Sequence, residues 1–181
     1  KSRICDHTPH LDIVIANVGD GQSVADPIPD QRQWESTWKT NFDSAITTAR
    51  EFLPTLIEAK GCLLFVSSIT ALEAFGAPVD YSTAKAAITA FAKNVARKVA
   101  MEVRVNVVAP GNIFFEDGSW DAKLSSDPET VNDYITSNVP MRRFGLPSEI
   151  ADAVVFLCSE RATFITGSVL VVDGGQTVRV L

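Results

Sequence analysis

The stretch Cys62–Lys85, CLLFVSSITALEAFGAPVDYSTAK, decides the fold class of this chain. It begins with the apolar run Cys62–Val66, which predicts a strand, and the polar turn Ser67-Ser68 closes that strand. A loop then leads to an Ala-rich segment, from about residue 79 to 100, which we expect to be helical. A strand followed by a helix is the repeating unit of an α/β protein with a parallel sheet.

The rest of the chain continues this alternation. Further strands are predicted at residues 11–16, 103–108 and 169–172, and further helices at about 31–60 and from 147 onward. The first of these strands is nearly all apolar, as a parallel strand covered on both faces would be. Pro54 is expected to kink or divide the long helix, and residues 112–140 are expected to be irregular. The order predicts a parallel sheet with right-handed crossovers, in one domain over residues 1–181.

Composition narrows the class of protein. The chain has 181 residues, of which 46% are apolar and 21% charged, as in a water-soluble globular protein. The net charge of −6 disfavours nucleic acid, and no apolar run approaches the roughly 20 residues needed to span a bilayer. The cysteines are odd in number and widely spaced, at Cys5, Cys62 and Cys158, which suits a reducing compartment. We therefore expect a cytoplasmic protein without a disulfide framework. The histidines, His7 and His10, offer no zinc-site spacing, and no metal is expected.

The predicted helix places Tyr81 and Lys85 four residues apart, so both side chains leave one face of the helix, one turn apart. Ser68 comes 13 residues before Tyr81, at the end of the strand. A hydroxyl facing a Tyr–Lys pair suits proton transfer to or from a carbonyl or alcohol oxygen. A free phenol has a pKa of about 10, and the Lys85 ammonium is expected to lower that of Tyr81. The plainer interpretations are a surface lysine beside a packed tyrosine, and a serine that caps a turn.

The strand ends should meet at one edge of this sheet. Ligands of open parallel sheets bind outside the carboxyl ends of the strands. The segments that follow the predicted strands are Asn17-Val18-Gly19, Ser67-Ser68 and Pro110-Gly111-Asn112-Ile113. Asn41 lies in the middle of a predicted helix, where asparagine is not favoured. Two interpretations stay open for it: a buried side chain bonded to backbone, or a residue that holds a water behind Lys85.

These residues resemble the motifs of the short-chain dehydrogenase/reductase family, and the resemblance covers nearly the whole chain from Asp12 to Gly175. The motifs concerned are Ala16–Gly19, the set Asn41, Ser68, Tyr81 and Lys85, then Pro110–Ile113, Arg143–Ile150 and Thr166–Gly175. The pattern is similar to that of the single-domain branch that includes 3-oxoacyl-carrier-protein reductases. The resemblance implies a Rossmann-type, doubly wound parallel α/β sheet.

The resemblance also implies roles for individual residues. The catalytic residues would be Asn41, Ser68, Tyr81 and Lys85, with Tyr81 as the acid/base. Cofactor contacts would come from Asn17, Gly19, Tyr81, Lys85, Pro110, Gly111 and Ile113, and the cofactor would be NAD or NADP. The implied reaction is hydride transfer between the nicotinamide ring and a small-molecule carbonyl or alcohol. Family members usually form tetramers, which implies a homo-oligomer, either a tetramer or a dimer, built on the two long helices.

The chain departs from the family in one large respect. The family begins with a strand, a Gly-x-x-x-Gly-x-Gly loop and a helix, followed by a second and third strand, and none of these appears here. That loop brings backbone N–H groups to the pyrophosphate of the cofactor. We therefore expect an N-terminally incomplete catalytic domain, the C-terminal portion of a longer chain, with residues 11–16 as a bare apolar sheet edge. The alternative is a truncated, non-catalytic protein of the same fold that acts as a binding or regulatory partner.

The segment from Phe114 to Val139 is predicted to be a substrate lid, because its length and irregularity are typical of a mobile active-site loop. Its aromatic residues either contact a substrate or pack the lid; they are Phe114, Phe115 and Trp120. Phe115 stands where the family often has a threonine that contacts the nicotinamide. Glu116 and Asp117 disfavour a phosphorylated or carboxylated substrate if they face the pocket.

Overall fold

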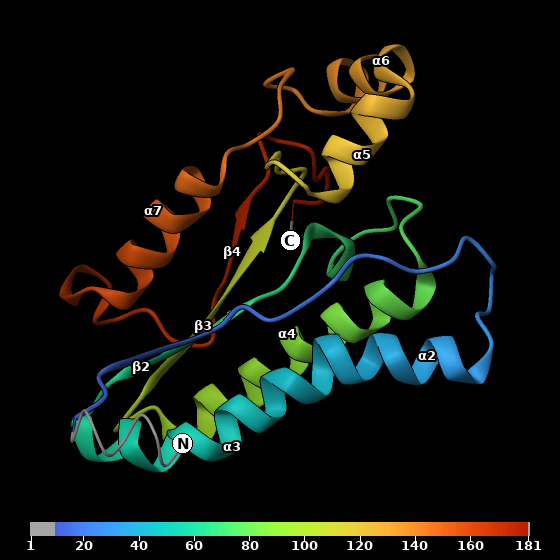
Figure 1. Cartoon of the computed structure of the whole chain (residues 1–181). Helices are drawn as coiled ribbons and strands as arrows, with labels where there is room; N and C mark the ends of the chain where they lie inside the picture. The colour runs from blue at the N-terminus through green and yellow to red at the C-terminus, as the bar shows by residue number, and fades with distance from the viewer. Residues whose placement is uncertain (1–9, 181) are drawn as a thin grey trace.

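The computed structural model describes residues 10–180, which form an α/β fold around a four-stranded sheet (Figure 1). The strands are β1 (Ile13–Ala16), β2 (Cys62–Val66), β3 (Arg104–Pro110) and β4 (Val169–Val172). Their order in the sheet is their order in the chain, and each neighbouring pair is parallel. The α/β class and the parallel sheet predicted from the sequence are confirmed.

Helices lie on both faces of the sheet (Figure 1). One face carries α2 (Gln31–Trp38), α3 (Ser44–Ala59) and α4 (Val79–Val99), and the other carries α7 (Pro147–Cys158). Two shorter helices, α5 (Ser119–Ser126) and α6 (Pro128–Asn138), lie beyond the carboxyl end of β3. The sheet is therefore doubly wound. Among residues 10–180, no helix combines the length and the apolar character that crossing a membrane requires.

The central strand β2 separates two apolar cores. Leu63 and Phe65 point to the α3 and α4 side, while Leu64 points to the α7 side, and all three side chains are fully buried. This alternation is the period of two expected of a strand, and here both faces of the strand are apolar because both are covered. Burying each of these side chains contributes roughly 1.5–3 kcal/mol. The position of β2 thus holds the two helical layers together.

Within the described residues β1 is an edge strand with an exposed apolar face, as expected for residues 11–16, but its burial corrects another prediction. We expected this strand to be covered on both faces, but only Val14 and Ala16 are buried. Ile13 and Ile15, on the opposite face, are 45% and 46% exposed. The reason is that α7 packs mainly on β2, β3 and β4, so within the described residues it leaves this face of β1 open.

The long helix is interrupted at a different place from the one predicted. Pro54 lies within α3, which runs through it without ending, and its side chain is on the exposed side of the helix. The irregular turn is instead a π-helical segment, Lys39–Asp43, between α2 and α3. A π-turn inserts one extra residue into the helix and is frequent at functional sites. This segment contains Asn41.

The segment predicted to be irregular contains the two short helices α5 and α6. A start signal is present for α6: the Asp127 carboxylate accepts a hydrogen bond from Thr130 N at 3.1 Å, and Pro128 occupies the first helical position. Val131 and Ile135, one turn apart, are its buried residues. The helices were missed because each gives too few turns for a clear apolar period.

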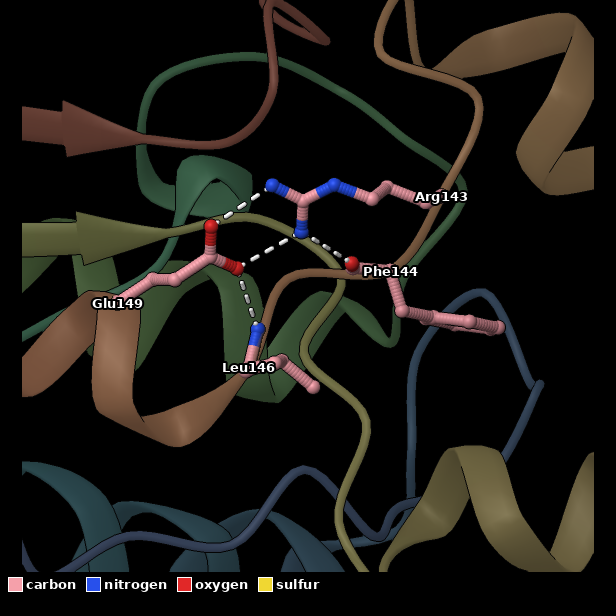
Figure 2. A network of polar contacts seen from close by, with 4 residues as sticks. All are labelled: Arg143, Phe144, Leu146 and Glu149. Carbon is pink, nitrogen blue, oxygen red and sulfur yellow. Dashed lines mark hydrogen bonds and ion pairs between the residues drawn. The ribbon is translucent and has the colours of Figure 1, made fainter.

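The start of α7 is held by the ion pair between Arg143 and Glu149 (Figure 2). The guanidinium donates to both carboxylate oxygens, at 2.8 and 2.7 Å, and Leu146 N donates to the same carboxylate at 2.9 Å. The loop that this network shapes pairs with the turn after β3, because Gly145 N donates to Asn112 O at 3.0 Å. The network therefore fixes the end of β3 relative to α7.

Glu149→Gln is expected to lower the melting temperature at neutral pH, because the amide cannot form the bidentate ion pair. Arg143 and the Leu146 N–H lower the pKa of Glu149 from its usual 4.5 to about 2. The stabilisation is therefore fully present above about pH 4.5 and is lost as the pH falls through about 2. Melting curves of parent and variant between these pH values measure the difference, which should shrink toward the acid end.

Asp152→Asn is the matched control, since it removes another exposed carboxylate of α7. A difference between parent and Glu149→Gln that stays constant down to about pH 2 would contradict the role given to this ion pair.

Candidate active site

The predicted site residues, except Asn41, line one cavity of about 640 Å³ at the carboxyl edge of the sheet. The strand ends and the loops after them contribute Asn17, Gly19, Ser68, Pro110, Gly111 and Ile113. The first turns of α4 contribute Tyr81 and Lys85. Parallel strands bring their carboxyl ends to the same edge, which is why segments so distant in the sequence converge.

A second cavity, of about 390 Å³, lies on the other side of Ser68 and Tyr81. It is lined partly by aromatic rings, including those of Phe75, Trp120 and Tyr134. Ser68 and Tyr81 line both cavities and therefore stand at their junction. Such a junction is where two bound molecules meet.

Ser68 makes the turn cap that was one of the two interpretations of this residue, while its catalytic role stays a prediction. It caps the short 3₁₀ turn Ile69–Ala71, where its Oγ accepts hydrogen bonds from Thr70 N at 3.2 Å and Thr70 Oγ1 at 3.1 Å. Both of these bonds use Oγ as an acceptor. A hydroxyl also has one donor, and the proton of Ser68 is directed either to Tyr81, whose pKa it lowers, or to a molecule in the cavity.

Lys85 is buried, with 4% of its surface exposed, and lies one turn from Tyr81 on α4. Its ammonium donates to Val66 O at 3.2 Å and lies 5.7 Å from the centroid of the Tyr81 ring. Burial lowers its pKa from 10.5 to about 8, because an ammonium loses hydration in the interior. The side chain is therefore no surface lysine, and at neutral pH it carries a charge close to the phenol.

The direction of the Tyr81 pKa corrects our prediction. Burial raises this pKa above its usual 10, and the contact with the Ser68 hydroxyl only partly counteracts it. The predicted lowering by the Lys85 ammonium is wrong for this structure, because the desolvation of the phenolate outweighs other effects. Tyr81 consequently holds its proton at neutral pH.

Asn41 lies in the π-helical segment and is fully buried. Its Nδ2 donates to Asp20 O at 2.9 Å and Thr37 O at 3.0 Å, and its Oδ1 accepts from Asp20 N at 3.1 Å. The side chain thus bonds to backbone and fastens the loop after β1. A water held behind Lys85 stays a prediction, since Asn41 does not line either cavity.

Asp80 is a buried residue that sequence reasoning missed. Its carboxylate accepts from Ser23 Oγ at 2.6 Å, Thr37 Oγ1 at 2.7 Å and Tyr81 N at 2.9 Å. Burial acts to raise the pKa of Asp80, but the hydrogen bonds from Ser23 and Thr37 hold it below its usual value. The carboxylate ties three elements together beside Tyr81. An acidic residue in the first turn of a helix was the available signal.

Two glycines allow the backbone to approach closely here. A Cβ at Gly19 would lie 2.7 Å from Lys85 Nζ and 2.9 Å from Asn41 Oδ1. A Cβ at Gly111 would lie 2.8 Å from Asp173 Cα. Side chains at these positions would displace Lys85 or separate the ends of β3 and β4. The absence of side chains at these two positions therefore leaves the cavity bordered by backbone.

The aromatic residues of the predicted lid divide by position. Phe115 lines the larger cavity, Trp120 lines both, and Phe114 packs on Phe144 with ring centroids 5.9 Å apart. Trp120 stacks on Tyr134 at 5.7 Å. The acidic pair at 116–117 is exposed and lines neither cavity, so it gives no argument against an anionic substrate.

Among residues 10–180, no three His, Cys, Asp or Glu side chains are grouped so as to hold a metal ion. His7 and Cys5 lie outside the described residues, so the histidine pair noted in the sequence is not placed.

The comparisons with known proteins agree on one family. The family model described as enoyl-(acyl carrier protein) reductase matches residues 2–177. The chain is 32% identical to a 3-oxoacyl-acyl-carrier-protein reductase of Chlamydia trachomatis and 34% identical to that of Aquifex aeolicus. Each alignment covers 92% of this chain and 65% of the relative. The chain thus spans about two thirds of the length of these relatives.

Solved structures show the same relationship. An oxidoreductase of the short-chain dehydrogenase/reductase family from Burkholderia thailandensis superposes with a TM-score of 0.87 at 28% identity. That alignment covers 97% of this chain and 69% of the oxidoreductase. A 7α-hydroxysteroid dehydrogenase, complexed with NADH and 7-oxo glycochenodeoxycholic acid, superposes with a TM-score of 0.85 at 26% identity. That alignment covers 98% of this chain and 69% of the enzyme.

Lys85→Met removes the buried charge while keeping a side chain of similar length. Between about pH 8 and the usual 10.5, the folded parent binds fewer protons than its unfolded chain, so its stability rises with pH. The variant lacks this rise. The difference in free energy of unfolding should move in favour of the parent by roughly 3 kcal/mol between about pH 7 and about pH 11. Urea denaturation at both pH values measures it.

Lys93→Met is the control, because Lys93 also lies on α4 and donates to a backbone carbonyl, Gly167 O at 2.7 Å, but is exposed. Stability curves for parent and Lys85→Met that run parallel over this pH range would show that Lys85 is not buried as a charge.

Proposed function

This chain belongs to the short-chain dehydrogenase/reductase family. We propose that it is part of an NAD(P)-dependent oxidoreductase that interconverts a carbonyl and a secondary alcohol. The observation that carries the proposal is the junction at Ser68 and Tyr81, which joins a larger cavity beside Lys85 to a smaller one lined by aromatic rings. A cofactor ring on one side and a substrate on the other would meet at these two hydroxyls. The hydride would pass directly between cofactor and substrate, so no protein group has to carry it.

The larger cavity is the proposed site for the nicotinamide half of NAD or NADP. Asn17, Gly19, Pro110, Gly111 and Ile113 line it from the strand ends, and the two glycines leave room for a ring against the backbone. When bound, the cofactor supplies or accepts a hydride at its nicotinamide ring. The neighbouring Lys85 ammonium is placed to donate a hydrogen bond to the ribose.

Tyr81 is the proposed acid. Its phenol is protonated at neutral pH, because the usual pKa of 10 lies far above 7 and burial raises it further, so it has a proton to give to a carbonyl oxygen. Ser68 donates its hydroxyl proton to the same oxygen and holds it in place. Alcohol oxidation uses the same two groups in reverse, with Tyr81 receiving the proton.

Lys85 acts on Tyr81 through its charge. Its pKa of about 8 keeps most of the side chain protonated at neutral pH, and its Nζ lies 5.7 Å from the centroid of the phenol ring. Once Tyr81 has given up its proton, this ammonium stabilises the phenolate that remains. The hydrogen bond to Val66 O orients the ammonium.

The smaller cavity is the proposed substrate site. Its lining combines the rings of Trp120 and Tyr134 with the amides of Asn112 and Gln176, which bond to each other at 2.8 Å. The helices α5 and α6 supply the two rings and form the proposed lid.

We extend the proposal to a homo-oligomer, a dimer or tetramer, and to a catalytic domain of which residues 1–181 are a part. An apolar groove of about 350 Å³ between α3 and α4 supports an assembly on these helices. It is lined mainly by apolar side chains, among them Ile46, Leu53, Ile57, Phe91 and Val95.

A second candidate is a non-catalytic binding protein of the same fold. The observation in its favour is the open face of β1, where Ile13 and Ile15 are about half exposed. A partner that bound this apolar face would not require a reaction at Tyr81.

Tyr81→Phe is expected to lower turnover by about 10²–10⁴-fold, because proton transfer is lost while the ring still fills its place. Oxidation of NADH and NADPH with a panel of ketones, followed by nicotinamide absorbance, measures it. Thr83→Ala, an exposed neighbour on α4, is the control and should keep parental turnover. Far-UV circular dichroism confirms that both variants fold.

Turnover of Tyr81→Phe within tenfold of the parent would contradict the role of Tyr81. Dinucleotide binding without turnover in the parent would favour the second candidate. If the folded parent showed no dinucleotide binding and no turnover, the proposal for this chain would be overturned.

A further inference from the structure

A pair of thiols lies at the opposite end of the sheet from the candidate active site. Cys62 is the first residue of β2 and Cys158 is the last residue of α7, yet their Sγ atoms are 4.0 Å apart. Both are free thiols, and neither lines the two cavities at the site. The proposed oxidoreductase mechanism does not use them.

The two thiols differ in accessibility. Cys62 is 2% exposed and its Sγ also contacts Leu157 O, at 3.8 Å. Cys158 is half-buried, so a small reagent reaches this sulfur first. A pair with one accessible and one enclosed thiol has the layout in which the first sulfur is attacked and the second resolves it.

A cation stands beside the more accessible thiol. The Arg104 guanidinium donates to Leu157 O at 2.6 Å and to the carbonyls of Cys158 and Ser159, each at 3.2 Å. The hydrogen bond with Cys62 and the charge of Arg104 lower the pKa of Cys158, whereas that same bond and burial raise the pKa of Cys62. Cys158 is therefore the thiol that ionises first, and the thiolate is the reactive form.

We propose that Cys62 and Cys158 form a reversible intramolecular disulfide when the protein meets a peroxide. The Cys158 thiolate attacks one oxygen of hydrogen peroxide: an S–O bond forms, the O–O bond breaks, and hydroxide leaves and takes up a proton. The Cys62 thiol then attacks the sulfenic sulfur, so that an S–S bond forms and water leaves. The sulfurs are oxidised and the peroxide is reduced, with two molecules of water as the product.

The movement required is small. A disulfide bond is about 2.05 Å long, so the sulfurs must approach by about 2 Å. Cys158 ends its helix, and the next residue, Ser159, is already extended, which gives this end of α7 room to adjust.

The bond would fasten α7 to the sheet. The chain between the two cysteines includes α4, β3 and the lid helices, so the bond closes a long loop. Closing a long loop stabilises the folded chain by restricting the unfolded one. Pro147 and Ile150, toward the other end of α7, line the larger cavity. Oxidation is thus expected to stabilise the wall of the site without occupying it.

The test treats the purified chain with a small excess of hydrogen peroxide, blocks remaining thiols with iodoacetamide and digests the protein with trypsin. The expected product is a cross-linked pair of peptides, residues 61–85 and 144–161, which dithiothreitol separates. The melting temperature should rise by roughly 5 °C or more on oxidation and return on reduction. These readouts do not depend on enzymatic activity.

Cys62→Ser and Cys158→Ser are matched variants that should each lose both the cross-link and the rise in melting temperature. In Cys62→Ser, the Cys158 sulfenic acid should persist long enough for trapping with dimedone. Peroxide-treated parent with both peptides alkylated and no cross-link would overturn the proposal. A cross-link found only between two chains, or only through Cys5, would overturn it as well.

Discussion

The register between β2 and α4 is the constraint on which the candidate site depends. Two hydrogen bonds set it: Ser67 Oγ donates to Lys85 O at 3.0 Å, and Lys85 Nζ donates to Val66 O at 3.2 Å. Because these bonds join the last residue of β2 and the residue after it to the second turn of α4, they hold Tyr81 near Ser68. A slip of one helical residue would rotate Tyr81 by about 100° and take its phenol out of the junction.

Buried polar groups secure the same arrangement from the other side. Asn41 holds the loop after β1 through Asp20, and Asp80 joins that loop to α2 and α4 through Ser23 and Thr37. The side chains of Asn41 and Asp80 are fully buried, and both form hydrogen bonds. Leaving one such group unpaired costs about 1–3 kcal/mol, so this loop has one favoured position. The stability of the network and the precision of the site have the same origin.

The burial of Lys85 lowers the stability of the folded chain at neutral pH and serves its proposed role in proton transfer at Tyr81. The charge lies in a place that costs free energy, as its lowered pKa shows, and its proposed role is to stabilise a Tyr81 phenolate once the proton has left. The helix α7 connects this region to the thiol pair, because residues between Pro147 and Val155 line the larger cavity while its last residue meets Cys62. One helix thus links the proposed redox-sensitive contact to the wall of the proposed cofactor site.

The sequence by itself determined the parallel α/β fold and the convergence of Ser68, Tyr81 and Lys85, because strand and helix periods are local and the carboxyl ends of parallel strands must meet. It did not determine the open face of β1, the backbone partners of Asn41 or the buried role of Asp80. The raised pKa of Tyr81 also came only from the tertiary structure. These features depend on which surfaces are covered and on contacts between residues far apart in the chain, and no local pattern carries that information.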